Sequence, residues 1–218
     1  MLPSWKGGIM TTIHDILRLG LVAAAVLGGT RTASAQTLAA LPSATVPASI
    51  AGEARPVLAW FQFCERNPRE CEVDTSQPAM ITLTGRVWQT IVAVNRQVNT
   101  SIKPMTDQAH WGIADSWEFP TDGAGDCEDY QLLKRKVLEQ AGIPRRAMRM
   151  TVVIDEKREG HAVLMIRTDR GDLILDNKIN NVLPWHETGY VYVKREGQDG
   201  TSWVSLGGAT SPVVTANR

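Results

Sequence analysis

The sequence is organised around one helix start, where a turn-prone segment at residues 121–125 runs directly into a helical pattern at Asp126. Aspartate is a favoured N-cap residue, and Gly142 and Pro144 are typical helix terminators. The apolar residues between them recur at helical spacing: Leu132, Leu133, Val137, Leu138 and Ala141. The pattern therefore predicts a helix with the thiol of Cys127 in its first turn.

Two opposing effects act on a thiol at this position. The positive end of the helix dipole favours the thiolate, whereas the carboxylates of Asp126, Glu128 and Asp129 disfavour it by charge repulsion. A bound Ca²⁺ would remove this conflict, because it takes carboxylate oxygens as ligands and cancels their field. The three acidic residues are therefore candidate calcium ligands. The alternative is a small apolar cysteine beside a solvated acidic first turn.

The segments after this helix are rich in β-forming residues. Two apolar runs enclose a turn at residues 169–171, which predicts a hairpin. We expect strands at 148–154, 161–167, 173–177, 190–194 and 202–206. Before them we expect a short helix or packed segment at 56–63 and an amphipathic helix at 83–99. An aromatic loop at residues 103–125 is expected to wall the thiol. Helices first, then antiparallel strands, is the pattern of an α+β fold.

The hairpin brings a histidine and a carboxylate together in one register. If its turn has two or four residues, paired residue numbers sum to 339, and Asp176 lies opposite Val163. Side chains 161 and 163 share a face, so Asp176 becomes a diagonal neighbour of His161, about 7 Å away between Cα atoms. A three-residue turn would move Asp176 to the other face, and the sequence leaves both turns open.

Nucleophilic cysteine chemistry needs a thiol, a base that takes its proton and a group that orients the base. Cys127, His161 and Asp176 are the candidates for these roles. His110, in the aromatic loop, and His186, beside Glu187, are rival histidines. The structural alternatives are a histidine satisfied at a strand edge and an aspartate that caps a turn. A zinc site is not expected, because no Cys/His cluster has ligand spacing.

The N-terminus has the features of a secretory signal peptide. Lys6 and Arg18 flank or enter an apolar run at residues 17–27, and Ala-Ser-Ala at residues 33–35 matches a cleavage site. An uncleaved anchor is the alternative. We expect a signal peptide at 1–35, a mobile lead-in at 36–55, one domain at 56–206 and a disordered tail at 207–218. The chain has no formal net charge, so no nucleic-acid partner is expected.

Cys64 and Cys71 lie on either side of Asn67-Pro68. On a straight helix their Cα atoms would be about 10 Å apart, which is too far for a disulfide. A turn at Asn67-Pro68 would bring them together, and an exported protein keeps such a bond. Cys127 is then the unpaired thiol.

Three motifs, at residues 125–130, 160–164 and 175–177, resemble those of the bacterial transglutaminase-like cysteine proteinases. The resemblance covers roughly residues 56–206 and implies a papain/transglutaminase-like α+β fold, with N-terminal helices packed on an antiparallel sheet. It also implies Cys127 as the nucleophile, His161 as the general base and Asp176 as its orienting partner. A calcium ion bound by acidic residues that flank the cysteine is a further implication of this family. The Cys64–Cys71 pair departs from the family pattern.

The expected function is that of a periplasmic cysteine endopeptidase that depends on Ca²⁺ and cleaves a protein. The resemblance makes a large surface adhesin a candidate substrate and an inner-membrane receptor a candidate regulatory partner. Two alternatives stay open. One is an acyl transferase that uses the same triad and passes the acyl group to an amine. The other is a non-enzymatic exported module whose acidic loop binds calcium structurally.

Overall fold

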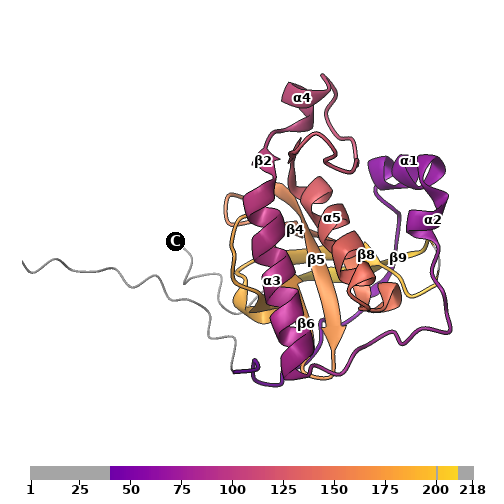
Figure 1. Ribbon diagram of the computed structural model, residues 1–218. Helices are drawn as coiled ribbons and strands as arrows, with labels where there is room; N and C mark the ends of the chain where they lie inside the picture. The colour runs from indigo at the N-terminus through magenta and orange to yellow at the C-terminus, as the bar shows by residue number, and fades with distance from the viewer. Residues whose placement is uncertain (1–39, 200, 211–218) are drawn as a thin grey trace, which may run out of the picture. The chain divides into compact units, whose positions relative to one another are not determined.

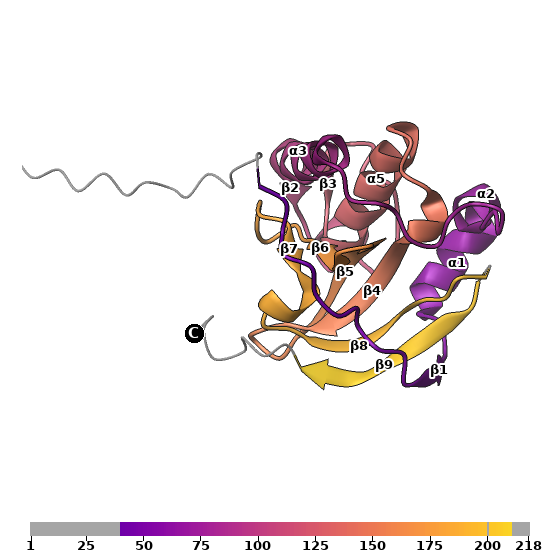
Figure 2. The same cartoon turned by 90° about the horizontal axis from the view of Figure 1, so that it is seen from below.

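A computed structural model describes residues 40–199 and 201–210 of the chain, and Figures 1 and 2 show its architecture. These residues form a seven-stranded antiparallel sheet in the order β1-β9-β8-β4-β5-β6-β7. Its strands are β1 (Gly52–Ala54), β4 (Met148–Ile154), β5 (Gly160–Thr168), β6 (Gly171–Leu175), β7 (Leu183–Pro184), β8 (Val191–Glu196) and β9 (Trp203–Thr210). The predicted α+β class is confirmed.

The helices are α1 (Leu58–Arg66), α2 (Pro68–Cys71), α3 (Gly85–Ser101), α4 (Asp107–His110) and α5 (Cys127–Gln140). Short 3₁₀ turns follow at η1 (Arg145–Ala147) and η2 (Trp185–Glu187), and β2 (Lys103–Pro104) pairs in parallel with β3 (Ala124–Gly125). None of the helices formed by the described residues has the length and apolar character needed to cross a membrane.

The main core lies between the sheet and the two long helices, α3 and α5, which run side by side over it (Figures 1 and 2). Thr84 caps α3, because its hydroxyl accepts the Val87 N–H at 3.3 Å. The apolar side chains of α3 at three- and four-residue spacing are buried, among them Trp88, Ile91 and Val98. Each such side chain contributes roughly 1.5–3 kcal/mol through burial. This packing fixes α5 against β5, where the candidate site lies.

The β5–β6 hairpin has the predicted register. Leu164 pairs with Leu175 and Thr168 with Gly171, so the turn has two residues and the pairs sum to 339. Gly171 adopts a φ of +98°, and a Cβ there would lie 2.3 Å from the Thr45 hydroxyl. A glycine is therefore required where the second strand leaves the turn.

Residues 40–55 differ from the expected mobile lead-in. β1 pairs with β9, and the N–H of the buried Ala48 donates to Asp172 Oδ2 at 3.0 Å. At the other end, β9 continues to Thr210, beyond the expected domain end at 206. Long-range strand pairing, rather than local composition, holds both segments. The predicted signal peptide at 1–35 and the part of the predicted tail at 211–218 lie outside the described residues.

The predicted disulfide joins Cys64 in α1 to Cys71 in α2, with the Cα atoms 5.6 Å apart. Asn67 ends α1 and Pro68 begins α2, so the chain turns where the sequence predicted. The carbonyl of Glu70 accepts N–H groups from Arg135 and Arg145, which ties this pair of helices to the main core. Cys127 is a free thiol.

Candidate active site

The start of α5 positions Cys127. Asp126 occupies the N-cap position, and its backbone N–H donates to Asp129 Oδ2 at 3.3 Å. A Cβ on Gly125 would lie 2.6 Å from that same oxygen, so the close approach of Asp129 needs a glycine at 125. The helix begins at Cys127 and ends at Gln140. The thiol therefore stands in the first turn, as predicted.

The hairpin brings His161 and Asp176 into contact. His161 lies near the start of β5 and Asp176 directly follows β6, and His161 Nε2 lies 2.9 Å from Asp176 Oδ1. Both side chains are buried. The two residues thus lie on the same face of the sheet, as the two-residue turn requires.

Four donors hold the Asp176 residue in place. Besides His161, the Tyr190 hydroxyl donates to Oδ2 at 2.6 Å and the Lys178 N–H to Oδ1 at 2.9 Å. Asn99 Nδ2 donates to the backbone carbonyl at 2.8 Å. Burial alone would raise the pKa of the Asp176 carboxyl, but the hydrogen bond and charge of His161, with the Lys178 and Tyr190 bonds, leave that pKa lowered. Asp176 is therefore an ionised partner for the imidazole.

The sequence reasoning missed Asn99 and Tyr190. Asn99 stands on α3 one turn after Asn95, and the side-chain amides of both donate to the backbone of residues 176–180. Two asparagines four residues apart, which share one face of the helix, were the available signal. Tyr190 had no comparable local signal, because its contact with Asp176 depends on strand packing.

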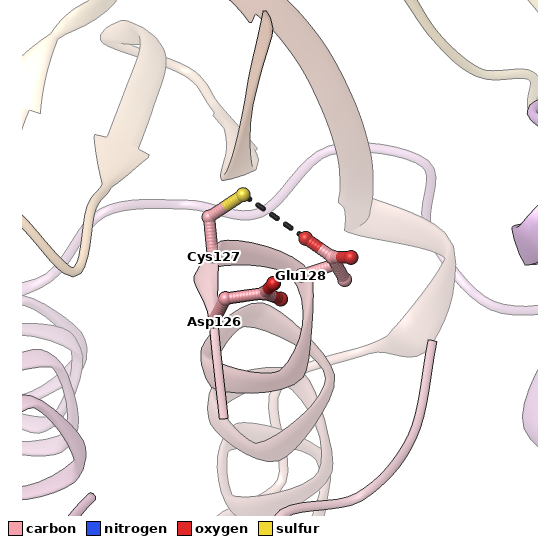
Figure 3. Close-up of side chains that lie close together, drawn as sticks. All are labelled: Asp126, Cys127 and Glu128. Carbon is pink, nitrogen blue, oxygen red and sulfur yellow. Dashed lines mark hydrogen bonds between the residues drawn. The ribbon is translucent and has the colours of Figure 1, made fainter. Parts of the chain in front are cut away.

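The thiol is directed toward a carboxylate in this structure. Cys127 Sγ lies 3.0 Å from Glu128 Oε2 (Figure 3), and the N–H of Ala162 donates to the same sulfur at 3.4 Å. Burial and the charge of Glu128 raise the pKa of Cys127 well above its ordinary value. Among the described residues, no hydrogen bond joins the sulfur to the second ring nitrogen of His161.

Cys127 and His161 nevertheless line one cavity, of about 340 Å³. Residues of the aromatic loop wall it on one side, including Ala114 and Trp117, and Val57 contributes from the segment before α1. The expectation that this loop walls the thiol is confirmed. A larger cavity, of about 740 Å³, lies beside the Cys64–Cys71 disulfide and contains none of the three candidate catalytic residues.

An acidic cluster surrounds the helix start. Three groups of side chains each bring their ligand atoms within 4.8 Å of one another: Asp126, Cys127 and Glu128; Asp107, Asp115 and Glu128; and Asp107, Asp126 and Asp129. Asp107, Asp126 and Glu128 each belong to two of these groups. Burial, followed by the charge of Asp126, raises the pKa of Glu128 to about 9, and burial raises that of Asp129 to about 8. The charge conflict predicted from sequence is therefore present in the folded chain.

Two members of this cluster, Asp107 and Asp115, were missed because they lie in the loop before the cysteine. The parallel β2–β3 pair aligns Lys103 with Ala124 and so brings Asp107 beside Asp126, whose Oδ2 accepts the Asp107 N–H at 3.1 Å. This pairing has no local sequence signal.

The rival histidines lie elsewhere. His110 Nε2 contacts Asp122 Oδ2 at 2.7 Å, and its ring stacks on Trp111. His186 lies 3.6 Å from Glu187. Neither histidine lines the cavity of Cys127.

Comparison with known proteins identifies the family. The sequence model described as "bacterial transglutaminase-like cysteine proteinase BTLCP" matches residues 50–211. The chain belongs to this family. It is therefore a cysteine peptidase with the transglutaminase-like α+β fold that the sequence motifs indicated.

Among solved structures, Legionella pneumophila LapG is similar to this family member at 20% identity, over 70% of this chain and 89% of that chain, with a TM-score of 0.46. Its calcium-bound form gives 20% identity, coverages of 70% and 91% and a TM-score of 0.44. The EGTA-treated form is 21% identical over 69% of this chain and 87% of that chain, with a TM-score of 0.45. A search of curated proteins gives no match.

Proposed function

We propose that this peptidase is an exported endopeptidase in which Cys127 attacks the peptide carbonyl, His161 moves the proton and Asp176 orients His161. The observation that carries the proposal is the 2.9 Å contact between His161 Nε2 and Asp176 Oδ1, beside the cavity that Cys127 also lines. A thiol, an imidazole and a buried carboxylate in this relation are the groups that nucleophilic cysteine catalysis needs.

The hydrogen bond to Asp176 assigns the two nitrogens of the His161 ring. An ionised Asp176 can only accept a hydrogen bond, so Nε2 is the donor in this contact and Nδ1 is left to accept the proton of the thiol. The lowered pKa of Asp176 keeps its carboxylate charged, and that charge stabilises the imidazolium that forms. Before attack, rotation about the Cα–Cβ bond of Cys127 must carry the sulfur from Glu128 toward His161.

The reaction then proceeds through a thioester. The Cys127 sulfur forms a bond to the carbonyl carbon, the C–N bond breaks and the leaving amine takes the proton from His161. Water, deprotonated by His161, attacks the thioester and releases the carboxylic acid and the thiol. As the first residue of α5, Cys127 has a backbone N–H without an intrahelical acceptor, and this group is the candidate donor to the oxyanion.

The acidic cluster suits a calcium ion. Asp107 Oδ1 and Asp126 Oδ1 are buried without a hydrogen-bond partner among the described residues, and unpaired buried carboxylate oxygens require a cation or a proton. Asp107, Asp126 and Glu128 would hold the ion, and a bound Ca²⁺ would neutralise the charge beside the thiol. Asp129 already accepts the N–H groups of Glu118 and Asp126. We therefore assign it to holding the start of α5 in place rather than to binding the ion.

Export rests on the N-terminal signal pattern, with residues 36–218 as the mature chain, and the Cys64–Cys71 disulfide is consistent with an oxidising compartment. A periplasmic location would make periplasmic and cell-surface proteins the accessible substrates. A large surface adhesin is then a candidate substrate, and an inner-membrane receptor a candidate regulator.

The proposal is tested by incubating denatured periplasmic proteins with the enzyme in H₂¹⁸O and a labelled amine, then mapping new termini by mass spectrometry. We expect internal cuts whose new carboxyl ends carry ¹⁸O, none with Cys127→Ala, and at least a hundredfold fewer with His161→Ala. New ends that carry the labelled amine and no ¹⁸O would show that the enzyme transfers the acyl group to amines instead of hydrolysing the peptide bond. Equal cutting by Cys127→Ala would refute the proposed nucleophile.

A further inference from the structure

A second cavity, of about 440 Å³, lies beside the hydrogen bond between Tyr190 and Asp176. It is formed mainly by the segment that follows Asp176, and includes Lys178, Ile179, Asn181 and Leu183. Thr188 and Tyr190, from the segment before β8, and Glu156, from the segment after β4, complete the wall. None of Cys127, His161 and Asp176 lines this cavity, so the proposed reaction does not account for it.

Only a pair of aromatic rings separates this cavity from the one at Cys127. Tyr190 lines the second cavity and His161 lines the first. Their ring centroids are 5.8 Å apart in an edge-to-face arrangement, and the Asp176 carboxylate bonds to both residues. A peptide bound at Cys127 whose leaving-group side passes over His161 is therefore directed toward the second cavity.

The direction of the peptide follows from the proton transfer. His161 must give its proton to the leaving nitrogen, so the leaving-group side of the scissile bond lies on the His161 side of the sulfur. An extended chain advances about 3.3 Å per residue, and two residues cover the distance from the His161 ring past the Tyr190 ring. The second cavity then faces the second residue after the scissile bond.

The cavity is chemically suited to an uncharged side chain. Its one ammonium, on Lys178, contacts the carboxylates of Asp155 and Glu156, the latter at 4.0 Å, so neither charged residue of the cavity wall is left unpaired. Ile179, which is 39% exposed, and Leu183 provide apolar surface in the cavity. The amide of Asn181 makes no side-chain hydrogen bond to the described residues and is free to bind the peptide backbone.

We propose that the cavity bounded by Ile179, Leu183 and Tyr190 is a substrate-binding subsite that accepts an apolar, uncharged side chain two residues after the scissile bond. This inference rests on the proposed endopeptidase function and adds a specificity determinant to it. Burial of such a side chain against Ile179 and Leu183 supplies binding energy on the leaving-group side.

The test compares Ile179→Asp with Ile50→Asp. Both isoleucines are partly exposed, at 39% and 49%, but Ile50 precedes β1 at the opposite edge of the sheet from β7. Each protein is given the same peptide library, and cleavage sites are mapped on both sides of the cut. The rate of Cys127 alkylation by iodoacetamide checks in parallel that the thiol and its surroundings are intact.

We expect wild type and Ile50→Asp to prefer apolar residues at the second position after the cut. Ile179→Asp should lower kcat/KM for peptides with leucine there by about tenfold and favour lysine at that position. Preferences before the cut and the alkylation rate should stay unchanged. Identical leaving-side preferences in all three proteins would overturn the subsite. Wild type that alkylates but cleaves no peptide would overturn the endopeptidase function, and the subsite with it.

Discussion

The Tyr190 hydroxyl donates a 2.6 Å hydrogen bond to Asp176 Oδ2, while Oδ1 of the same carboxylate contacts His161. Tyr190 and Asp176 are both buried, so neither bond competes with water. A carboxylate held at both oxygens has a fixed plane, and the His161 ring takes its orientation from it. Tyr190 is thereby a positioning residue for the proposed catalytic pair.

Tyr190→Phe should shift the acid side of the activity profile. Because the Tyr190 bond helps to lower the pKa of Asp176, its loss should raise that pKa and move the acid limb of kcat/KM to higher pH. A hydrogen bond to a charged group is worth about 1.5–3 kcal/mol, so kcat/KM should fall by about tenfold or more. The measurement is a pH–rate profile with a fixed peptide.

The same variant should change stability at low pH. A lowered folded-state pKa means that Asp176 contributes stability above the unfolded-state value of about 3.9, and that this contribution is lost as pH falls through the folded value. Tyr190→Phe should lose it at higher pH. Tyr192→Phe is the matched control, because that hydroxyl bonds to Thr188 at 2.9 Å instead. If kcat/KM falls at the same acidic pH in both variants, Tyr190 does not position the Asp176 carboxylate.

Calcium removal should reduce activity and stability together. The buried carboxylates at the start of α5 repel one another and oppose formation of the Cys127 thiolate. Ca²⁺ at a hundredfold excess over its Kd would stabilise the folded chain by about 2.7 kcal/mol. We expect chelation to lower both the melting temperature and the alkylation rate, Ca²⁺ to restore both, and Mg²⁺ to restore them poorly because it needs tighter octahedral geometry.

Single substitutions distinguish the proposed calcium ligands from a neighbouring aspartate. Asp107→Asn and Asp126→Asn should weaken the calcium response, whereas Asp122→Asn should leave it intact because Asp122 contacts His110 outside the cluster. Cys127→Ala should abolish turnover but keep calcium-dependent melting. Metal-free protein with full activity and an unchanged melting curve would end the calcium proposal.

Local sequence signals were sufficient for the elements that carry the proposed triad. The Asp126 N-cap and the apolar spacing after it predicted α5, and the apolar runs around residues 169–171 predicted the β5–β6 hairpin. The sequence left open the length of the turn, which decides on which face of the sheet Asp176 lies. Thr168 pairs with Gly171, so the turn has two residues and His161 meets Asp176.

Features that depend on long-range contacts were not predictable in the same way. Asp107 joins the acidic cluster through the β2–β3 pair, and residues 52–54 become a strand only by pairing with β9. The Cys127 side chain contacts Glu128 rather than His161, although the sequence order of the three residues is the same in either case. Periodicity and residue type carry no information on such contacts, because they arise after the elements have packed.

Removal of the disulfide should destabilise the protein without unfolding its main core. Cys64 and Cys71 close a short loop, and the chain-entropy relation assigns about 2–3 kcal/mol to a loop of this size. The double variant Cys64→Ser, Cys71→Ser should lose that much in urea denaturation. Wild type denatured without reductant should titrate as one thiol, that of Cys127. Three titrating thiols in protein isolated from the periplasm would contradict the disulfide.

Glu196 should be among the most costly single residues to neutralise. Its buried carboxylate accepts two bonds from Arg135 at 3.0 Å, one from the Trp60 ring N–H at 2.9 Å and one from the Met150 N–H at 2.9 Å. Burial would raise its pKa, but the charges of Arg135 and Arg145 outweigh this and lower it to about 2.

Glu196→Gln would leave the two buried arginines without their counter-charge, so we expect a loss of about 3–5 kcal/mol in the free energy of unfolding. Since the folded-state pKa is lowered, the difference between wild type and variant should be full above the unfolded value of about 4.3 and should shrink as pH falls toward 2. Glu118→Gln, in an exposed pair with Arg66 at 2.6 Å, is the matched control and should cost under about 1 kcal/mol. Urea denaturation at several pH values measures both, and equal losses at neutral pH would show that the Glu196 charge does not stabilise the fold.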